Sequence, residues 1–440
     1  MKSRWKPAWM GVAINLIPVI AVVQIGFGQG GLPGGAASTG VTASGRMTPG
    51  VLAPETMISE STIPGAVTQG VRNQLIIDSQ EGSRGRMESG LSMHYNRVDG
   101  LYVQLGLETA WKQPALLGFF GRGGYAFKGE AWRYEIGLER WFQLGPARVT
   151  LGVRNYDLTH SEDEWLLPME ENSAAAFFFR EDFMDYYRLI GTSLSIDTEL
   201  YRRLTVQLAY LLDEHESLKR RTNWSLFGGD KKFRENPPVM EEKVYSLLIR
   251  LGYDTRDDFM EPAGGFLIET VYEKAGGGLG GELDFERLLV DARRYIYLTR
   301  HENIDLRLRV GTSAGDMPVQ MAFDLGGLGS LRGYKHKEFR DFNRMILGNL
   351  EYRIGIGRVS SGWIEDYQVI PFYDLGLAWN SNDTGSLTAG FDQVRADRIK
   401  TSVGIGFSTG ADDRLRVNLT RRLDDRDEPL AVTVRFHRIF

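Results

Sequence analysis

The chain has 440 residues, with 52 basic and 57 acidic side chains and a formal net charge of −5, so no global basic field attracts nucleic acid. Cysteine is absent, which excludes disulfides, thiolate metal sites and cysteine catalysis. The six histidines form no H-E-x-x-H pair. Composition therefore predicts neither a metal site of these kinds nor a nucleic-acid partner.

The N-terminus has the layout of a secretory signal peptide over residues 1–28. Three basic residues within the first six precede a mostly apolar run from Ala8 to Phe27, and glycines stand at −3 and −1 of a cut before Gln29. An uncleaved membrane anchor is the alternative, because the run is long for a signal core. No later segment approaches 18 consecutive apolar residues, so no helical membrane span is predicted in the rest of the chain.

The next segment is predicted to be a disordered linker over residues 29–88. From Gln29 to Gly70 it is rich in Gly, Ser, Thr, Pro and Ala and contains no aromatic residue. Such a segment cannot bury enough apolar surface to offset the entropy lost on ordering. A single large domain is expected to follow, over residues 89–440.

Alternation of apolar and polar side chains dominates the chain from Ser89 onward. In "LYVQLGLE", residues 101–108, the apolar side chains occupy every second position, and "IDLRLRV", residues 304–310, repeats the pattern. Period two is the signature of a β-strand with two different faces. A water-soluble sandwich would also alternate, but these strands are longer than the usual five or six residues. Their polar positions hold Arg, Glu and Gln at mid-strand, and aromatic residues gather near strand ends.

The pattern predicts sixteen strands. They lie near 89–95, 100–110, 117–128, 131–142, 147–157, 186–198, 201–213, 243–254, 265–275, 283–298, 303–312, 344–356, 366–380, 396–409, 412–421 and 429–440. An even number suits a transmembrane antiparallel β-barrel, whose tilted strands need about 9–11 residues each. The long connections all follow odd-numbered strands, as external loops do in this class, and they are 158–185, 214–242, 313–343 and 381–395.

The stretch "FDLGGLGSLRGYKHKEF", residues 323–339, lies between predicted strands 11 and 12. A phosphate-binding loop is disfavoured, because the glycines do not form G-x-G-x-x-G and no G-K-[ST] follows. The stretch resembles the sixth extracellular loop of BamA/TamA-type outer-membrane barrels, the bacterial surface antigen superfamily. The hallmark tetrad of that loop is carried by Leu331, Arg332, Gly333 and Tyr334.

Three further segments resemble the same family, in the family's order. They are "GYDTRDDFMEPAGGFLIE" (252–269), "GNLEYRI" (348–354) and "FYDLG" (372–376), the last with Phe372, Asp374 and Gly376. Alternation independently points Asp374 and Glu351 toward the barrel interior. The resemblance implies that the loop folds inward and that Arg332 contacts Asp374, with Glu351 nearby. We call this expected arrangement the latch.

Two features bear on how far the resemblance extends. The family's assembly machines carry periplasmic POTRA modules, and the segment between linker and barrel is too short for one, so none is expected here. The C-terminus resembles the outer-membrane insertion signal through Phe436 and Phe440, whereas Arg438 occupies a position that is normally apolar.

Other chemistry is not expected. The segments "HSEDE" (160–164) and "DEHES" (213–217) place His beside Ser and acids, but solvated external loops are the favoured interpretation over a catalytic site. No catalytic residue, metal site or cofactor is predicted, so the protein is not expected to be an enzyme. The aromatic-rich segment 174–187 is expected in an external loop, where it could pack on the rim, touch the membrane or bind a partner.

The resemblance implies a role in inserting or translocating protein or lipid at the bacterial outer membrane, with a weak seam between the first and last strands. The expected partners are outer-membrane lipid, the barrel-assembly machinery during biogenesis and a protein or lipid substrate. The alternatives are a passive solute pore and a structural or adhesive surface protein.

Overall fold

The computed structural model describes residues 86–110, 116–259, 261–357, 367–409, 415–425, 427–436 and 438. The predicted signal peptide and nearly all of the predicted linker lie outside this range, as does Phe440. Within it, no helix is long and apolar enough to cross a membrane.

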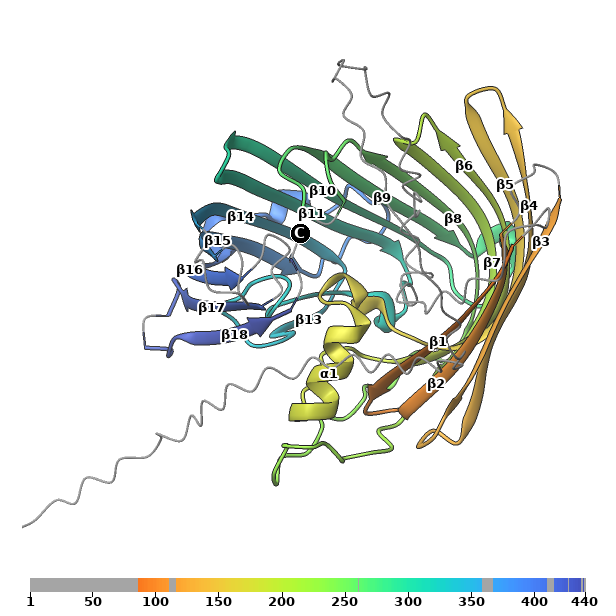
Figure 1. The fold of residues 1–440 in the computed structure, drawn as a ribbon, viewed down its shortest axis with the longest axis horizontal. Helices are drawn as coiled ribbons and strands as arrows, with labels where there is room; N and C mark the ends of the chain where they lie inside the picture. Colours follow the sequence, from red (N-terminus) through yellow and green to blue (C-terminus); the bar gives the residue numbers. More distant parts are fainter. Residues whose placement is uncertain are drawn as a thin grey trace, which may run out of the picture. The chain divides into compact units, whose positions relative to one another are not determined.

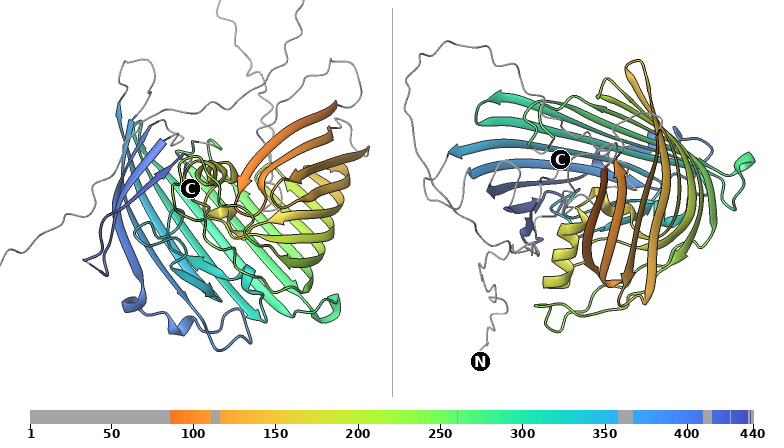
Figure 2. Two further views of the ribbon diagram at one scale, coloured as in Figure 1. Left: turned by 90° about the horizontal axis from the view of Figure 1, so that it is seen from below. Right: turned by 45° about the vertical axis from the view of Figure 1, so that its right-hand side comes forward.

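Sixteen strands form one antiparallel sheet in which nearly all neighbours are consecutive in the chain (Figure 1). Their order in the sheet is β1 Arg86–Asn96, β2 Gly100–Ala110, β3 Leu117–Ala126, β4 Ala131–Leu144, β5 Ala147–His160, β6 Tyr187–Leu200, β7 Leu204–Ser217, β8 Lys243–Asp254, β9 Gly265–Ala275, β10 Phe285–Thr299, β11 Glu302–Gly315, β14 Arg344–Gly357, β15 Tyr367–Trp379, β16 Lys400–Thr409, β17 Leu415–Arg422 and β18 Ala431–Arg435. The colours of Figure 2 follow this order from orange to blue across the sheet.

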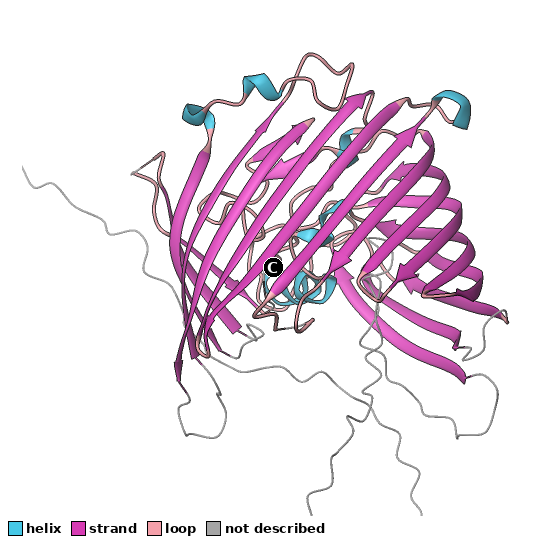
Figure 3. Ribbon diagram, turned by 90° about the horizontal axis from the view of Figure 1, so that it is seen from above, coloured by secondary structure: helices cyan, strands magenta, loops and turns pink. Residues whose placement is uncertain are grey.

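The predicted number and order of strands are confirmed. Most boundaries agree within three residues, and β1 begins at Arg86 rather than Ser89. The last strand differs most, because β18 ends at Arg435 instead of continuing to the C-terminus. The four longest connections follow β5, β7, β11 and β15, which are odd-numbered in sheet order, so they leave the same end of the antiparallel array (Figure 3).

The two faces of the sheet differ in the way that the alternation predicts. On β17, Arg416, Asn418 and Thr420 are fully buried on the inner face, while Leu419 is exposed on the outer face. On β14, Glu351 is buried, and its neighbour Leu350 is exposed. A polar inner face that is buried and an apolar outer face that is exposed are the inverse of a water-soluble sheet.

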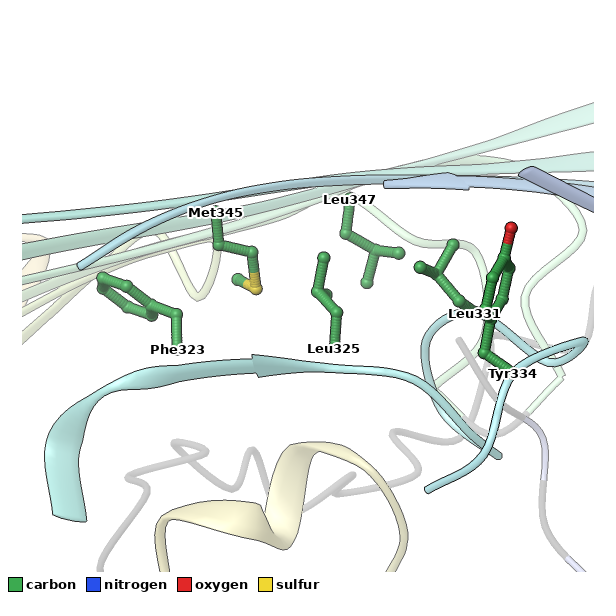
Figure 4. Close-up of a cluster of buried hydrophobic side chains, with 6 residues drawn as sticks. All are labelled: Phe323, Leu325, Leu331, Tyr334, Met345 and Leu347. Carbon is green, nitrogen blue, oxygen red and sulfur yellow. The ribbon is translucent and has the colours of Figure 1, made fainter. Parts of the chain in front are cut away.

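The inner face is buried because the long connections fold against it. A small sheet of β12 (Phe323–Leu325) and β13 (Phe339–Phe342) lies in the connection from β11 to β14. Figure 4 shows Met345 and Leu347 on β14 pointing toward Phe323 and Leu325 on β12. This apolar cluster, together with the latch tetrad's Leu331 and Tyr334, forms a core between the sheet and its own loop.

Helix α1 (Met169–Phe179) lies in the connection from β5 to β6, a segment that the sequence left as an irregular loop. Two acidic residues occupy its first turn, where they favour the helix dipole, and three consecutive alanines follow. It ends where Arg180 adopts a left-handed conformation (φ 58°). Five 3-10 turns are also described: η1 Glu162–Trp165, η2 Gly277–Leu279, η3 Val319–Met321, η4 Phe391–Gln393 and η5 Ala396–Arg398.

Candidate functional site

The latch is formed by Arg332 and two carboxylates on neighbouring strands. Arg332 Nε and Nη2 donate to the two oxygens of Asp374 on β15, at 2.9 and 2.5 Å. Its Nη1 donates to Glu351 on β14, at 2.5 Å. The Arg332 side chain is 1% exposed, and both carboxylate side chains are 0% exposed. The structure thus brings together the three residues that the sequence placed at this site.

Further polar groups surround each carboxylate. Glu351 also accepts two hydrogen bonds from Arg416 on β17, both 2.9 Å long, and one from Arg353. Asp374 accepts from Asn349, at 2.8 Å, and from Ser402. A buried charge is tolerated only when it is paired and its remaining hydrogen-bonding capacity is used. The latch satisfies this condition for both carboxylates.

The residues of the "FYDLG" segment (372–376) on β15 each have a physical role. The Phe372 ring lies under the guanidinium of Arg332, whose Cζ is 3.5 Å from the ring centroid, a cation–π contact. A side chain at Gly376 would meet Leu325 and Leu331 at 3.2 Å, so glycine lets the loop approach β15 closely. Phe372, Asp374 and Gly376 therefore form one docking surface for the loop.

The remaining tetrad residues attach the loop to β16 and β17. A Cβ at Gly333 would lie 2.7 Å from the Ser402 side chain, which leaves no space for a larger residue. The Tyr334 hydroxyl donates to Asp424, at 2.9 Å, and accepts from the Thr401 amide, at 3.1 Å. Burial and the neighbouring Asp424 raise the pKa of Tyr334 above its usual value. Tyr334 stays neutral and keeps its donor across the physiological range.

A second charged cluster, which the sequence did not predict, holds the loop on its other side. Lys337 Nζ contacts three carboxylates, Asp163 and Asp185 at 2.8 Å and Asp324 at 3.0 Å. Burial disfavours the ammonium form, but these carboxylates outweigh it and raise the pKa of Lys337 above its usual value. Lys337 is therefore charged and links the connection after β11 to the connection after β5.

Asp185 is the centre of this cluster. Besides Lys337, it binds Arg97 from the β1–β2 turn, at 2.9 Å, Arg340 at 3.1 Å, and Arg234 from the connection after β7. Burial opposes ionisation, but the surrounding cations, Lys337 first, hold the pKa of Asp185 below its usual range. One carboxylate thus joins four separate connections at the same end of the sheet.

Helix α1 contacts both terminal strands of the sheet (Figure 1). Glu171 accepts from Arg435 Nε on β18, at 2.8 Å, and from the Phe436 amide, at 3.2 Å. Ser173 Oγ accepts from the Tyr95 amide on β1, at 2.6 Å. We call these contacts the α1 bridge, because they connect the first and last strands through one helix.

The C-terminal residues divide between the two faces. Phe436 is exposed after β18, in register with the exposed Val432 and Val434. Arg438 donates to Asp305 at 2.6 Å and to the Pro262 carbonyl at 3.0 Å. Since Asp305 is fully buried, Arg438 meets a buried carboxylate on β11. That contact accounts for an arginine at a position where an apolar residue was expected.

The expectation that 160–164 and 213–217 are solvated external loops is wrong. Ser161 and Asp163 are buried, as are Asp213 and His215 on β7. The Tyr187 ring lies against both His160 and His215, with centroid distances of 5.3 and 4.8 Å. The polar composition of these segments suggested that they are exposed to solvent. Instead, partners distant in the sequence stabilise them inside the fold; Arg287, for example, contacts Glu162 at 3.1 Å.

Some of the site residues that were not predicted could have been found from the alternating pattern of the sequence. Arg416 lies at an inward position of the alternating pattern on β17, so its approach to inward Glu351 could have been proposed. The contacts of Lys337, of Asp185 and of the α1 bridge carried none, because at least one residue in each comes from a connection, whose conformation follows no period.

The fold and the latch together define a transmembrane β-barrel protein with a loop folded against its inner wall. The family model described as the Omp85 superfamily domain matches residues 142–428, well over half of the sequence. The chain belongs to the Omp85 superfamily.

Among curated proteins, the outer membrane protein assembly factor BamA of Nitratidesulfovibrio vulgaris (strain Hildenborough) is 29% identical over 247 residues. The match covers 52% of this chain and 28% of that protein. The crystal structure of BamA from Haemophilus ducreyi lacking POTRA domains 1–3 has a TM-score of 0.50 at 12% identity, covering 80% of this chain and 69% of that one, and shows similarity of fold alone. CdiB from Acinetobacter baumannii has a TM-score of 0.37 at 11% identity, covering 81% and 59% of the two chains, which is too low to support an argument.

Proposed function

We propose that the protein inserts or translocates other proteins at the bacterial outer membrane. The observation that carries the proposal is the latch: the residues that make the chain similar to the family are the same ones that hold the loop on the inner wall. A motif whose every member has a buried partner is a built device rather than a chance resemblance. Membership of the Omp85 superfamily supports the same conclusion.

The filled inner face favours this function over a passive pore. Loop residues Leu331 and Tyr334 pack with Met345 and Leu347 of the wall in an apolar cluster, and Arg332 is buried against it. A solute pore needs a hydrated, polar channel, whereas these contacts occupy the interior with a packed loop. We propose no catalytic activity and no cofactor, and the role requires only the membrane, a protein substrate and the machinery that assembles the barrel itself.

The test is an insertion assay with the purified protein in liposomes. A urea-unfolded, small outer-membrane β-barrel is added, and its folding is followed as heat-resistant mobility on a semi-native gel. We expect folding at least several-fold faster than with liposomes that hold an unrelated sixteen-stranded barrel of the porin type. Equal rates would contradict the proposal. Liposome swelling in sugar solutions would then indicate a pore, and movement of a fluorescent lipid between leaflets would indicate lipid transport.

A further inference from the structure

The end of α1 and the tip of the connection after β7 form one exposed aromatic surface, residues 177–179 with 224–227. Phe179, Trp224, Leu226 and Phe227 are 56%, 50%, 50% and 66% exposed. Large apolar side chains gathered at this exposure are uncommon on a surface that faces only water. We therefore expect another molecule or the membrane to cover this surface.

The surface is held in a fixed shape. The amides of Leu226 and Phe227 donate to the carbonyls of Phe177 and Phe178, both at 2.8 Å. The Phe178 and Phe227 rings stack with centroids 6.2 Å apart, and Phe177 meets Trp224 edge-on at 5.2 Å. Two segments far apart in the sequence thus present their aromatic rings together.

The aromatic surface continues the outer, apolar face of the sheet. Tyr95 on β1 contacts Phe177 and Trp224 edge-on, and its hydroxyl donates to the Trp224 carbonyl at 2.7 Å. Tyr95 pairs directly with Leu101 on β2, and the Phe127 amide donates to the Leu101 carbonyl at 2.9 Å. Leu101 and Phe127 are exposed. One apolar row therefore runs across the ends of β3, β2 and β1 into the aromatic surface.

Its position along the sheet is that of an interfacial belt. Tyr125 at the end of β3 groups with Phe127 and with Trp132 at the start of β4, at centroid distances of 5.4 and 5.2 Å. Aromatic rings at strand ends are enriched where lipid acyl chains meet headgroups. The aromatic surface lies next to this group along the same row, and exposed lysines Lys231 and Lys232 follow it in the chain.

We propose that the aromatic surface is a membrane contact: its rings lie at the boundary between headgroups and acyl chains, beside the end of β1. Exposed Lys232, which follows it in the chain, suits the phosphate groups of lipid headgroups, whereas Lys231 pairs with Glu181. This inference rests on the barrel's lying in a bilayer and not on any insertion activity. It assigns the end of α1 and the tip of the connection after β7 to the lipid surface, in addition to the outer face of the sheet.

The absence of cysteine from the chain allows a direct test. Phe227→Cys is labelled with an environment-sensitive fluorophore, and the folded protein is placed in liposomes. Quenching is measured with lipids that carry a nitroxide near the headgroup and with aqueous iodide. Leu105→Cys on the outer face of β2 is the lipid-facing control, and Asn382→Cys in the exposed connection after β15 is the aqueous control.

We expect the label at 227 to be quenched by the nitroxide lipid within about twofold of the label at 105, and by iodide several-fold less than the label at 382. Leu226→Cys should give the same result, which guards against a local effect of one substitution. If both labels behave as at 382, the surface faces water or a protein partner, and the inference is wrong. The readout needs only a heat-resistant barrel in the bilayer, so a failed insertion assay leaves it intact.

Discussion

The latch and the α1 bridge both fasten loop segments to the sheet, but they differ in what holds them. The latch joins a loop to β14 and β15, which have strand neighbours on both sides, and its carboxylates Glu351 and Asp374 each have several polar partners. The α1 bridge joins the two terminal strands through the ion pair of Glu171 with Arg435, the hydrogen bond from the Phe436 amide to Glu171, and the hydrogen bond from the Tyr95 amide to Ser173. Breaking a network in which one carboxylate pairs with several buried cations costs more than releasing a single ion pair and the hydrogen bonds beside it.

The difference suggests a division between a fixed wall and a removable closure. The strands from β14 to β17 are held to the loop at many points and should stay together. The α1 bridge should open at a lower free energy, since local opening follows the least stabilised contacts. The predictions below test this ranking.

The largest effect is expected at Glu351, which pairs with three arginines: Arg332, Arg353 and Arg416. Glu351→Gln leaves these cations with less neutralisation in a buried site, so we expect a loss of about 3–5 kcal/mol in the free energy of unfolding. Urea unfolding in detergent micelles, followed by heat-resistant mobility on a semi-native gel, measures it. Glu214→Gln removes an exposed carboxylate from β7 and serves as the control. Equal midpoints for the two variants would contradict the buried network.

The next effect concerns the direct pair. Arg332→Ala and Asp374→Ala should each lower the fraction of heat-resistant barrel, at a cost of about 3 kcal/mol, and the double variant should be no worse than the worse single one. Arg332→Lys should retain only part of the heat-resistant fraction. An ammonium makes neither the bidentate contact with Asp374 nor the same contact with the Phe372 ring. If the loss in the double variant equals the sum of the losses in the two single variants, Arg332 and Asp374 do not interact.

The latch was open to prediction because its two carboxylates lie on strands and the family resemblance supplied Arg332 of the loop. Period two decides which side chains face inward, so Asp374 and Glu351 could be placed on the inner wall before the fold was known. Sheet order then brings neighbouring strands together. The sixteen strands and the ends at which long connections occur followed from the same pattern.

The α1 bridge was not open to prediction for the opposite reason. Glu171 and Arg435 are separated by 264 positions, and Ser173 and Tyr95 by 78. Their meeting depends on the path of a loop, which neither alternation nor composition records. The prediction that the acidic segment 160–164 is solvated failed for the same reason, because its charges are paired with cations distant in the sequence instead of with water.

A smaller, local effect is expected when the α1 bridge is weakened. Glu171→Gln removes the charge that holds Arg435, which should lower the local stability by about 1.5–3 kcal/mol. That corresponds to hydrogen exchange about 10–100-fold faster in residues 169–179 and at the end of β1. Glu170→Gln, its exposed neighbour on the same helix, is the matched control. Exchange in residues 323–339 should not change. If the loop and α1 accelerate together, the two fastenings form one unit and the proposed division fails.

The last effect is a pH dependence of the loop itself. His336 contacts Phe183 edge-on, and burial, reinforced by Arg234 and Lys337, lowers the pKa of His336 to about 3. Because an undocked histidine titrates near its ordinary value of about 6.5, the undocked loop binds more protons below that pH. The contribution of neutral His336 to docking is therefore fully present above about pH 6.5 and is lost progressively as the pH falls toward 3.

Limited proteolysis of residues 316–343 should become faster over this range, whereas His336→Gln, which does not titrate, should show a flatter profile. Identical profiles for the two proteins would show that His336 does not carry the dependence, and the acids around Lys337 would then have to account for any that remains.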